Sequence, residues 1–182
     1  MVWNEKIDSG CIFLRSLEEG DLSRTHEWLH RPELSEIMGV KVPFSMQSQM
    51  VWFDKLKNQD NKYVFAVCLQ SSSEHIGNVS IDIDWVNRNG RLSIFLAGKS
   101  DRDRGLGTLA MRALISFAFD KLGLHRVWLK ATADKPQLLR FYTKCGFRIE
   151  GRLVEHEFKG GRFVDKLIFG QLTTINNLTA NA

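Results

Sequence analysis

Near the middle of the chain stands the stretch RDRGLGT, residues 102–108, between a strand-like run and a helix-like run. Before it, LSIFLA (92–97) alternates large apolar with smaller side chains, a pattern that favours a β-strand. After it, apolar residues recur at helical spacing from Leu106 to Phe117, and Gly123 supplies a stop signal. Glycines at such a junction let the backbone approach a bound group closely, and the N–H groups and dipole of the following helix favour an anion. The stretch therefore predicts a site for a phosphorylated ligand.

Other known loops fit these residues less well. A strand-to-helix turn whose glycines merely relieve steric strain is the plain alternative, because short glycine patterns also arise by chance. The dinucleotide fingerprint requires a third glycine and a βαβ unit near the start of the chain, whereas this stretch lies past mid-chain after several strands. The nucleoside-triphosphate loop requires a Gly-Lys-Ser/Thr ending, which Gly107-Thr108 lacks. A calcium loop beginning at Asp101 would place Arg112 where a bidentate carboxylate belongs, so we expect no calcium.

Two motifs carry a resemblance to a known family. The pattern Arg102-x-x-Gly105-x-Gly107 resembles the acetyl-coenzyme A signature of the GNAT superfamily of N-acetyltransferases, Gln/Arg-x-x-Gly-x-Gly/Ala. About one helix and one strand later, LRFYTKCGF (139–147) is similar to the family's Tyr-x-Lys-x-Gly-Phe segment. Ordered motifs at plausible separations are far more specific than one glycine pattern.

Three further segments resemble one branch of this superfamily, which contains ribosomal-protein, spermidine and amino-sugar N-acetyltransferases. They are IGN (76–78), EGR (150–152) and GGRFVD (160–165). The resemblance spans about residues 11–172 and implies an α+β fold in a single GNAT-like domain, 1–172, followed by a polar tail, 173–182. Such a domain has a mixed, mostly antiparallel central sheet flanked by helices, and a splayed pair of strands forms the cofactor cleft.

Hydrophobic periodicity and turn signals place the elements of this fold. We expect strands at 11–15, 63–69, 75–85, 91–97 and 126–131 and a closing hairpin at 147–158 and 162–172. We expect helices at 21–30, 46–58 and 136–145, and one that follows the glycine stretch. Turns are expected at Asn87-Arg88-Asn89-Gly90 and at Lys159-Gly160-Gly161.

The resemblance also implies acetyl-coenzyme A as cosubstrate, without a metal. In this superfamily the strand before the glycine stretch splays from its neighbour, and its backbone binds the pantetheine arm. The implied cofactor-binding residues are Phe95, Leu96, Ala97, Arg102, Asp103, Arg104, Gly105, Leu106, Gly107 and Thr108. One position departs from the pattern, because Lys135 stands where many members carry an asparagine that holds the pantetheine arm. Asp134 lies beside it, and which of the two takes that place stays open.

The implied reaction is direct transfer of an acetyl group to a primary amine in a ternary complex. It needs an unprotonated amine, a donor for the oxyanion and a proton donor for the leaving thiolate. A backbone N–H among 95–97 would serve the oxyanion, and Tyr142 matches the family tyrosine that protonates the sulfur; its alternative is a packed core ring. Asp82 and Asp84 share one strand face, where either could bind the amine or take its proton through water, or face solvent.

Two other functions remain as alternatives. HEWLH (26–30) matches the zinc-peptidase pattern His-Glu-x-x-His, which on a helix would place His26 and His30 on one face with Glu27 beside them. Pro32 shortens that helix and no recognisable third ligand follows, so we favour the acetyltransferase. A GNAT-like fold could also bind acetyl-coenzyme A without turnover, as a sensor or interaction module, because fold does not fix function.

Composition indicates one compact chain in a reducing compartment. The 182 residues are 43% hydrophobic, enough for one substantial core. No apolar run reaches membrane-spanning length, and the first residues lack the apolar stretch of a signal peptide. Cys11, Cys68 and Cys145 are widely spaced, which favours free thiols in the cytoplasm over disulfides or a zinc ribbon.

The charge and the motifs together limit the classes of partner that we expect. The formal charge of +4 is too dispersed to indicate a nucleic-acid partner, and we expect no membrane partner. We expect a small-molecule or peptide amine as acceptor, with a protein amino terminus, a polyamine and an amino sugar as the candidates. A homodimer is also left open.

Overall fold

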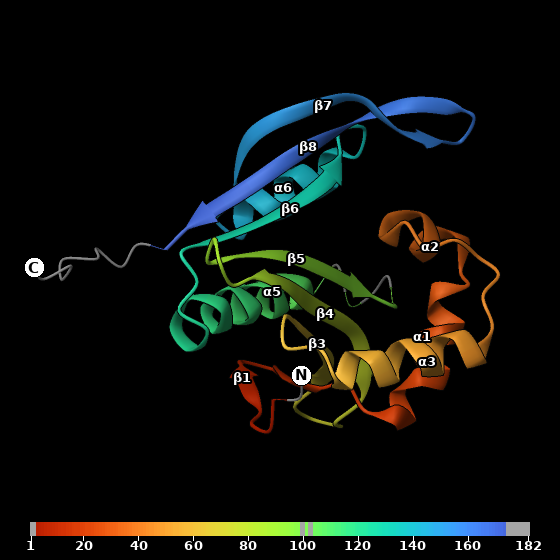
Figure 1. Cartoon of the computed structure of the whole chain (residues 1–182), viewed down its shortest axis with the longest axis vertical. Coiled ribbons are helices and arrows are strands. Elements are labelled where there is room, and N and C mark those ends of the chain that lie inside the picture. The colour runs from red at the N-terminus through yellow and green to blue at the C-terminus, as the bar shows by residue number, and fades with distance from the viewer. Residues whose placement is uncertain (1–2, 99–100, 102–103, 174–182) are drawn as a thin grey trace, which may run out of the picture.

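The computed structural model describes residues 3–98, 101 and 104–173. Its centre is an eight-stranded sheet with the order β1-β2-β3-β4-β5-β6-β8-β7 (Figure 1). The strands are β1 (Ile7–Ser9), β2 (Ile12–Ser16), β3 (Lys62–Leu69), β4 (His75–Asp84), β5 (Asn89–Leu96), β6 (Arg126–Thr132), β7 (Arg148–Lys159) and β8 (Arg162–Leu172). The helices are α1 (Leu22–Leu29), α2 (Pro32–Met38), α3 (Met46–Lys57), α5 (Leu106–Ser116) and α6 (Pro136–Lys144). A 3-10 turn, η1 (Glu19–Asp21), precedes α1, and a π-helical turn, η2 (Phe117–Lys121), extends α5.

The predicted fold class is confirmed. Neighbouring strands are antiparallel except β5 and β6, which are parallel, so the sheet is mixed and mostly antiparallel. The sequence predictions miss β1, which has three residues and is too short for a periodic pattern. They also miss α2, in which Pro32 occupies the first turn and Gly39 ends the helix with a φ of 64°. The proline that ends the preceding helix therefore also begins the next one.

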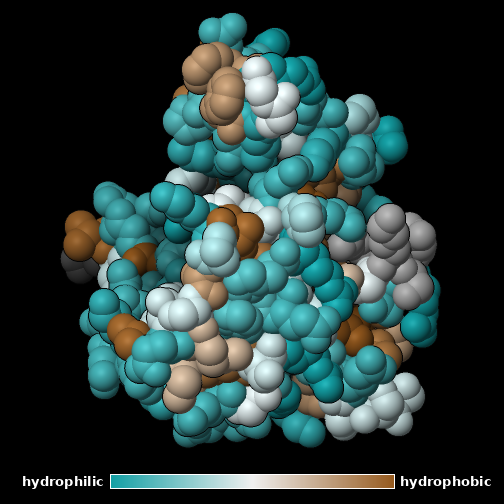
Figure 2. Space-filling model, turned by 90° about the vertical axis from the view of Figure 1, so that its right-hand side faces the viewer, coloured by the Kyte–Doolittle hydropathy of each residue, from teal (hydrophilic) through white to brown (hydrophobic). Residues whose placement is uncertain are grey.

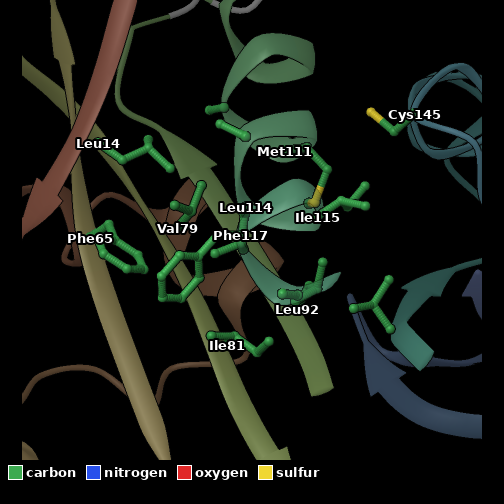
Figure 3. Close-up of a cluster of buried hydrophobic side chains, with 14 of the residues drawn as sticks. Leu14, Phe65, Val79, Ile81, Leu92, Met111, Leu114, Ile115, Phe117 and Cys145 are labelled. Carbon is green, nitrogen blue, oxygen red and sulfur yellow. The ribbon is translucent and has the colours of Figure 1, made fainter. Parts of the chain in front are cut away.

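Two hydrophobic layers cover the two faces of the sheet. Successive side chains of a strand point to opposite faces, so β2 and β3 contribute to both layers. On one face, Phe65 and Val79 belong to the main core with Leu114 of α5 (Figure 3). On the other face, Val64 belongs to a smaller cluster with Phe53 of α3. The sheet therefore lies between α5 on one side and the early helices on the other.

The sheet splits between β5 and β6. Their parallel pairing joins Asn89 to Arg126, Gly90 to Val127 and Arg91 to Trp128. Beyond Arg91, β5 continues to pair with β4 as far as Leu96, while β6 pairs with β8 as far as Thr132. The two strands thus diverge, as the splayed pair in the predicted fold requires.

A buried ion cluster ties β2, η1 and β4 together. Arg15 donates two hydrogen bonds to the Asp21 carboxylate, at 2.6 and 2.8 Å. The Glu18 N–H also donates to this carboxylate at 2.9 Å, and His75 Nδ1 lies 3.2 Å from Asp21 Oδ1. Burial would raise the pKa of Asp21, but the hydrogen bonds from Arg15, His75 and Glu18 outweigh it and hold the pKa well below its usual value.

The β7–β8 hairpin projects beyond the rest of the sheet (Figures 1 and 2). Near its turn it carries three exposed apolar side chains, Val154, Phe158 and Phe163, which are 72%, 63% and 61% exposed. The rings of Phe158 and Phe163 contact each other at a centroid distance of 5.1 Å. Among the helices of the described residues, none is both long and apolar enough to cross a membrane.

We predict that Asp21→Asn lowers the free energy of unfolding by about 3 kcal/mol, because the amide removes the buried charge that the Arg15 guanidinium binds through two hydrogen bonds. Denaturant unfolding at pH 7 measures the change. The matched control is Asp54→Asn, which breaks an exposed ion pair with Lys57 and should change stability by less than about 0.5 kcal/mol.

The same substitution has a pH signature. A carboxylate whose pKa is depressed by folding stabilises the native state above its unfolded pKa, about 4, and this contribution is lost as the pH falls. The difference between wild type and Asp21→Asn should therefore shrink below about pH 4. A difference that is independent of pH would contradict the ionic role.

Candidate active site

A cavity of about 610 Å³ lies between the early helices and the sheet. Its helical wall is mainly apolar and includes Leu29, Ile37, Met38, Val40, Phe44 and Trp52. Its sheet wall is polar and includes Asn78, Ser80 and Asp82 of β4 with Arg91 and Ser93 of β5. A cavity of this size suits a small organic ligand whose body is held by apolar contacts and oriented by polar groups.

The cavity passes through the split in the sheet. Ser93 and Phe95 project from the face that the early helices cover, whereas Leu92 and Ile94 alternate with them and project from the other face. All four residues line the cavity, together with Tyr142 of α6. A ligand in the split is therefore accessible from the side of the early helices and from the side of α6 at once.

Tyr142 lies at the α6 side of this passage. Its ring packs against Phe141, Phe147 and Phe169 at centroid distances of 4.9, 6.1 and 5.4 Å. Its hydroxyl makes no hydrogen bond within the described part of the chain. Burial raises the pKa of Tyr142 to about 12, because the phenolate would lose its hydration, and the nearby Cys145 thiol adds to the shift. The ring is therefore part of the core, as the alternative interpretation expected, and the residue also lines the cavity, as a catalytic role would require.

The two carboxylates of β4 have different surroundings. Asp82 lines the cavity and forms ion pairs with Lys62 at 2.7 Å and with Arg91 at 3.1 Å. Asp84 is outside the cavity lining, at the turn between β4 and β5. There it accepts hydrogen bonds from the Asn87 side chain at 2.7 Å and from the Asn87 N–H at 3.0 Å, which lower its pKa. Asp84 thus holds the turn, while Asp82 faces the ligand space.

The glycine stretch forms the junction between β5 and α5. Arg102 and Asp103 lie outside the described residues, and Arg104 is exposed. Gly105 precedes α5 with a φ of 77°, a conformation that L side chains rarely adopt. Leu106, Gly107 and Thr108 follow in the first helical turn. The Thr108 N–H donates to the Gly105 carbonyl at 3.0 Å, so the N–H groups of Leu106 and Gly107 are the ones that precede the hydrogen bonds of the helix. Their geometry suits an anion at the helix amino terminus.

The end of β5 is held close to β4. The Ala97 N–H donates to the Ile76 carbonyl at 2.9 Å, so by alternation the N–H groups of Ile94 and Leu96 point to the edge that faces β6. Phe95 is buried, with its ring 6.2 Å from that of Trp28. Gly77 permits this closeness, because a Cβ there would stand 2.3 Å from the Phe95 carbonyl oxygen.

Lys135 and Asp134 stand at the start of α6. Lys135 occupies the N-cap position. Asp134 accepts a hydrogen bond from Thr132 at 2.7 Å and pairs with Arg162 at 2.8 Å. The Thr132 bond is the main cause that lowers the pKa of Asp134. Asp134 is thus engaged in joining β6 to β8.

The histidines of the zinc-peptidase pattern bind the backbone of the segment between α2 and α3. His26 Nε2 lies 3.0 Å from the Phe44 carbonyl oxygen, and His30 Nδ1 lies 2.8 Å from the His26 carbonyl oxygen. His30 Nε2 accepts the Phe44 N–H at 3.3 Å. Glu27 pairs with Arg31 at 2.8 Å. These contacts use both nitrogens of His30 and keep Phe44 at the cavity wall.

Sequence reasoning did not single out several residues of the cavity. Four of them are cations from four strands: Lys62, Arg91, Lys130 and Lys166. Asn78 is another, and its side-chain oxygen contacts His75 Nε2 at 2.6 Å, within the buried ion cluster. Alternation along each strand places a residue on a face, but it does not indicate which residues of different strands surround one space.

Comparison with known proteins identifies the family to which the chain belongs. A sequence profile of the acetyltransferase (GNAT) domain matches residues 12–148. The chain belongs to this family. Its membership confirms the resemblance seen in the glycine and tyrosine motifs, and the chain is accordingly an N-acetyltransferase enzyme rather than a zinc peptidase.

Relatives within the family differ in acceptor. Spermidine N(1)-acetyltransferase of Vibrio cholerae is 29% identical over 161 residues, which cover 85% of this chain and 88% of the relative. L-amino acid N-acetyltransferase AaaT of Escherichia coli is 24% identical and covers 85% and 93%. A crystal structure of the Vibrio cholerae spermidine N-acetyltransferase in complex with CoA and spermine superposes with a TM-score of 0.84 at 24% identity, covering 89% of this chain and 95% of that one. The fold is shared, and the acceptor is not fixed by it.

We predict that His30→Ala lowers the free energy of unfolding by about 1–2 kcal/mol, because two partly buried hydrogen bonds are lost. Thermal unfolding measures this loss, with His125→Ala, at an exposed position, as the control. A chelator should leave the melting temperature of the wild type unchanged. If zinc raised the melting temperature of the wild type but not of His30→Ala, the histidine pair would be a metal site.

Proposed function

We propose that this enzyme moves the acetyl group of acetyl-coenzyme A directly to a primary amine that is bound in the cavity, within a ternary complex. The observation that carries the proposal is the passage through the split between β5 and β6, with Tyr142 on one side and the acceptor space on the other. Release of free coenzyme A in the presence of an amine tests it. Binding of acetyl-coenzyme A without release would favour the non-catalytic sensor.

The chemistry follows from the groups that line this passage. The amine nitrogen, as a free base, attacks the thioester carbon, and the carbon–sulfur bond breaks when the amide has formed. The edge of β5 that faces β6 offers the Ile94 N–H as donor to the thioester oxygen, where negative charge develops. Tyr142 then gives its hydroxyl proton to the departing thiolate, the proton released by the amine goes to solvent, and Tyr142 regains a proton from solvent before the next turnover.

We propose that Asp82 orders the cavity and does not act as the general base. Both of its oxygens are engaged by cations, Lys62 on one and Arg91 on the other. These two contacts occupy the oxygens that would have to accept the proton of the amine. Asp84 lies outside the cavity and has no part in the proposed reaction. The amine therefore has to lose its proton before it attacks, through water in the open cavity.

We propose that coenzyme A binds with its pyrophosphate at the amino terminus of α5, on the backbone of residues 104–108, and with its pantetheine arm along β5 near residues 95–97. The left-handed Gly105 and the first turn of α5 support this placement. Arg102 and Asp103 complete the stretch in the family pattern. Lys135, at the N-cap of α6, takes the position of the family asparagine.

We further propose a domain over 1–172 with a tail from 173, a cytoplasmic location, and self-association into a homodimer. The end of β8 at Leu172 supports the boundary, although the Thr173 N–H still donates to the His125 carbonyl at 3.0 Å. The free thiols of Cys11, Cys68 and Cys145 support a reducing compartment. The exposed apolar side chains of the β7–β8 hairpin support self-association.

We predict that Gly105→Ala weakens coenzyme A binding about tenfold. An alanine at a φ of 77° strains the backbone, by about 1 kcal/mol, at the place where the loop meets the pyrophosphate. Gly161→Ala is the matched control, because Gly161 has a φ of 79° and lies in the β7–β8 turn with equally open surroundings. Both variants should lose similar stability, and calorimetric titration should show weaker binding for Gly105→Ala alone. Equal coenzyme A affinity of the two variants would show that the pyrophosphate does not bind at this loop.

We predict that Tyr142→Phe lowers kcat about 10²-fold, the lower range for a positioned general acid. Stability and coenzyme A affinity should stay near wild type, because the ring packing is kept and the hydroxyl has no hydrogen-bond partner in the described structure. Tyr63→Phe, in a buried tyrosine outside the cavity lining, is the control. Full activity of Tyr142→Phe would show that solvent, and not Tyr142, protonates the departing thiolate.

The raised pKa of Tyr142 adds a pH signature to this prediction. With a pKa of about 12, the hydroxyl stays protonated throughout the range in which the amine becomes a free base. The kcat of the wild type should therefore rise from pH 7 to about pH 10 without a decline. A decline with an apparent pKa near 8 would show that another group supplies the proton.

A further inference from the structure

The charged residues of the cavity wall are nearly all cations. Five of its lining residues are basic, namely Lys41, Lys62, Arg91, Lys130 and Lys166, and one, Asp82, is acidic. Asp82 is already paired with Lys62 and Arg91. Lys166 pairs at 3.0 Å with Glu157, which lies behind the wall and also pairs with Lys159. Even with Glu157 counted, the five cations exceed the two carboxylates.

These cations face one space because the strand register aligns them. Lys62 of β3 is the register partner of Asp82 on β4, and Asp82 is the register partner of Arg91 on β5. Arg91 is the partner of Trp128 on β6, so Lys130, two residues further on, projects from the same face. Lys166 is the partner of Thr132, and it also shares this face. The cations therefore stand on both sides of the split, on the face that the early helices cover.

Two of the cations have no partner to neutralise them. Within the described residues, neither Lys41 nor Lys130 forms an ion pair or a side-chain hydrogen bond. Lys41 follows α2 at the helical wall, and Lys130 lies beside the split on β6. A ligand between them meets a positive potential from both walls, which attracts an anion and repels a polycation.

We propose that the acceptor is a small primary amine that also carries an anionic group, a phosphate or a carboxylate, and that polyamines are poor acceptors. The proposal rests on the proposed acetyl transfer and names its substrate class. The amine lies at the split beside Tyr142, and the anion lies among Lys130, Arg91 and Lys41. Phe44 and Trp52 cover the body of the acceptor from the helical wall. The acetyl transfer itself is balanced as written above, since the anion takes no part in the bond changes.

The test compares acceptors that differ in the anion alone. Glucosamine 6-phosphate is paired with glucosamine, and L-alanine with L-alaninamide; spermidine is the polycation. Rates are expressed per concentration of free amine, so that differences in amine pKa do not enter. We expect kcat/KM to be higher for the anionic member of at least one pair by about tenfold or more, the factor that one charged hydrogen bond supplies. The pair that responds identifies phosphate or carboxylate. Equal values within each pair, or spermidine as the best acceptor, would overturn the proposal.

A substitution of Lys130 tests where the anionic group of the acceptor binds. Lys130→Gln should lower kcat/KM for the responding anionic acceptor about tenfold and change that of its uncharged counterpart less than twofold. Lys121→Gln, at an exposed lysine of η2 outside the cavity lining, is the matched control. An equal fall for both members of the pair would show a structural effect and overturn the role of Lys130.

A binding measurement separates this proposal from the proposed function. Calorimetric titration of glucosamine 6-phosphate and of L-alanine into the coenzyme A-loaded enzyme reads the anion site without any chemistry. If no amine is acetylated but an anionic amine binds in a manner that depends on Lys130, acetyl transfer fails and the anion site stands. If acetylation occurs but neither anionic amine binds better than its uncharged counterpart, acetyl transfer stands and the anion site fails.

Discussion

The parallel pairing of β5 with β6 stops after three residue pairs, and the site depends on where it stops. Each strand is supported on its other edge, β5 by β4 and β6 by β8, so the two can diverge without fraying. Gly77 contributes directly, because its missing side chain lets β4 lie against the Phe95 carbonyl and hold the end of β5 on that side. The gap is therefore a property of the pairing within the sheet.

The same gap explains how one tyrosine can belong to the core and also line the cavity. Tyr142 belongs to the main hydrophobic cluster, on the side of the sheet opposite the early helices, yet it lines the cavity because the strands between have separated. Burial keeps its pKa raised, so the hydroxyl holds a proton at any pH at which amines are nucleophilic. Packing fixes the ring, and the hydroxyl remains available to the ligand space. A solvent-exposed tyrosine would have neither property.

Local signals in the sequence predict much of the fold, but they predict only some of the residues of the candidate site. The glycine stretch, the succession of strands and helices along the chain except β1 and α2, and the closing hairpin are readable from period, turn residues and motif spacing. Asp82 and Asp84 show the limit of such reading. Alternation correctly puts both on one face, but Asp84 ends the strand beyond the helices and caps a turn, while Asp82 lies under them. HEWLH shows a second limit, since its histidines satisfy backbone groups of a segment whose course only the tertiary structure sets.

The acceptor wall is the part that neither motif nor fold determines. Coenzyme A is bound in this family mainly by backbone at a glycine loop and a strand edge, which side-chain changes disturb little. The wall facing the acceptor consists of side chains from the early helices and from the outer face of the sheet, and these can change sign without altering the core. In this chain Asp82 stands between Lys62 and Arg91 and offsets their mutual repulsion in the absence of a ligand. A single carboxylate thus lets the protein keep a wall on which cations from four strands and from the segment after α2 lie together.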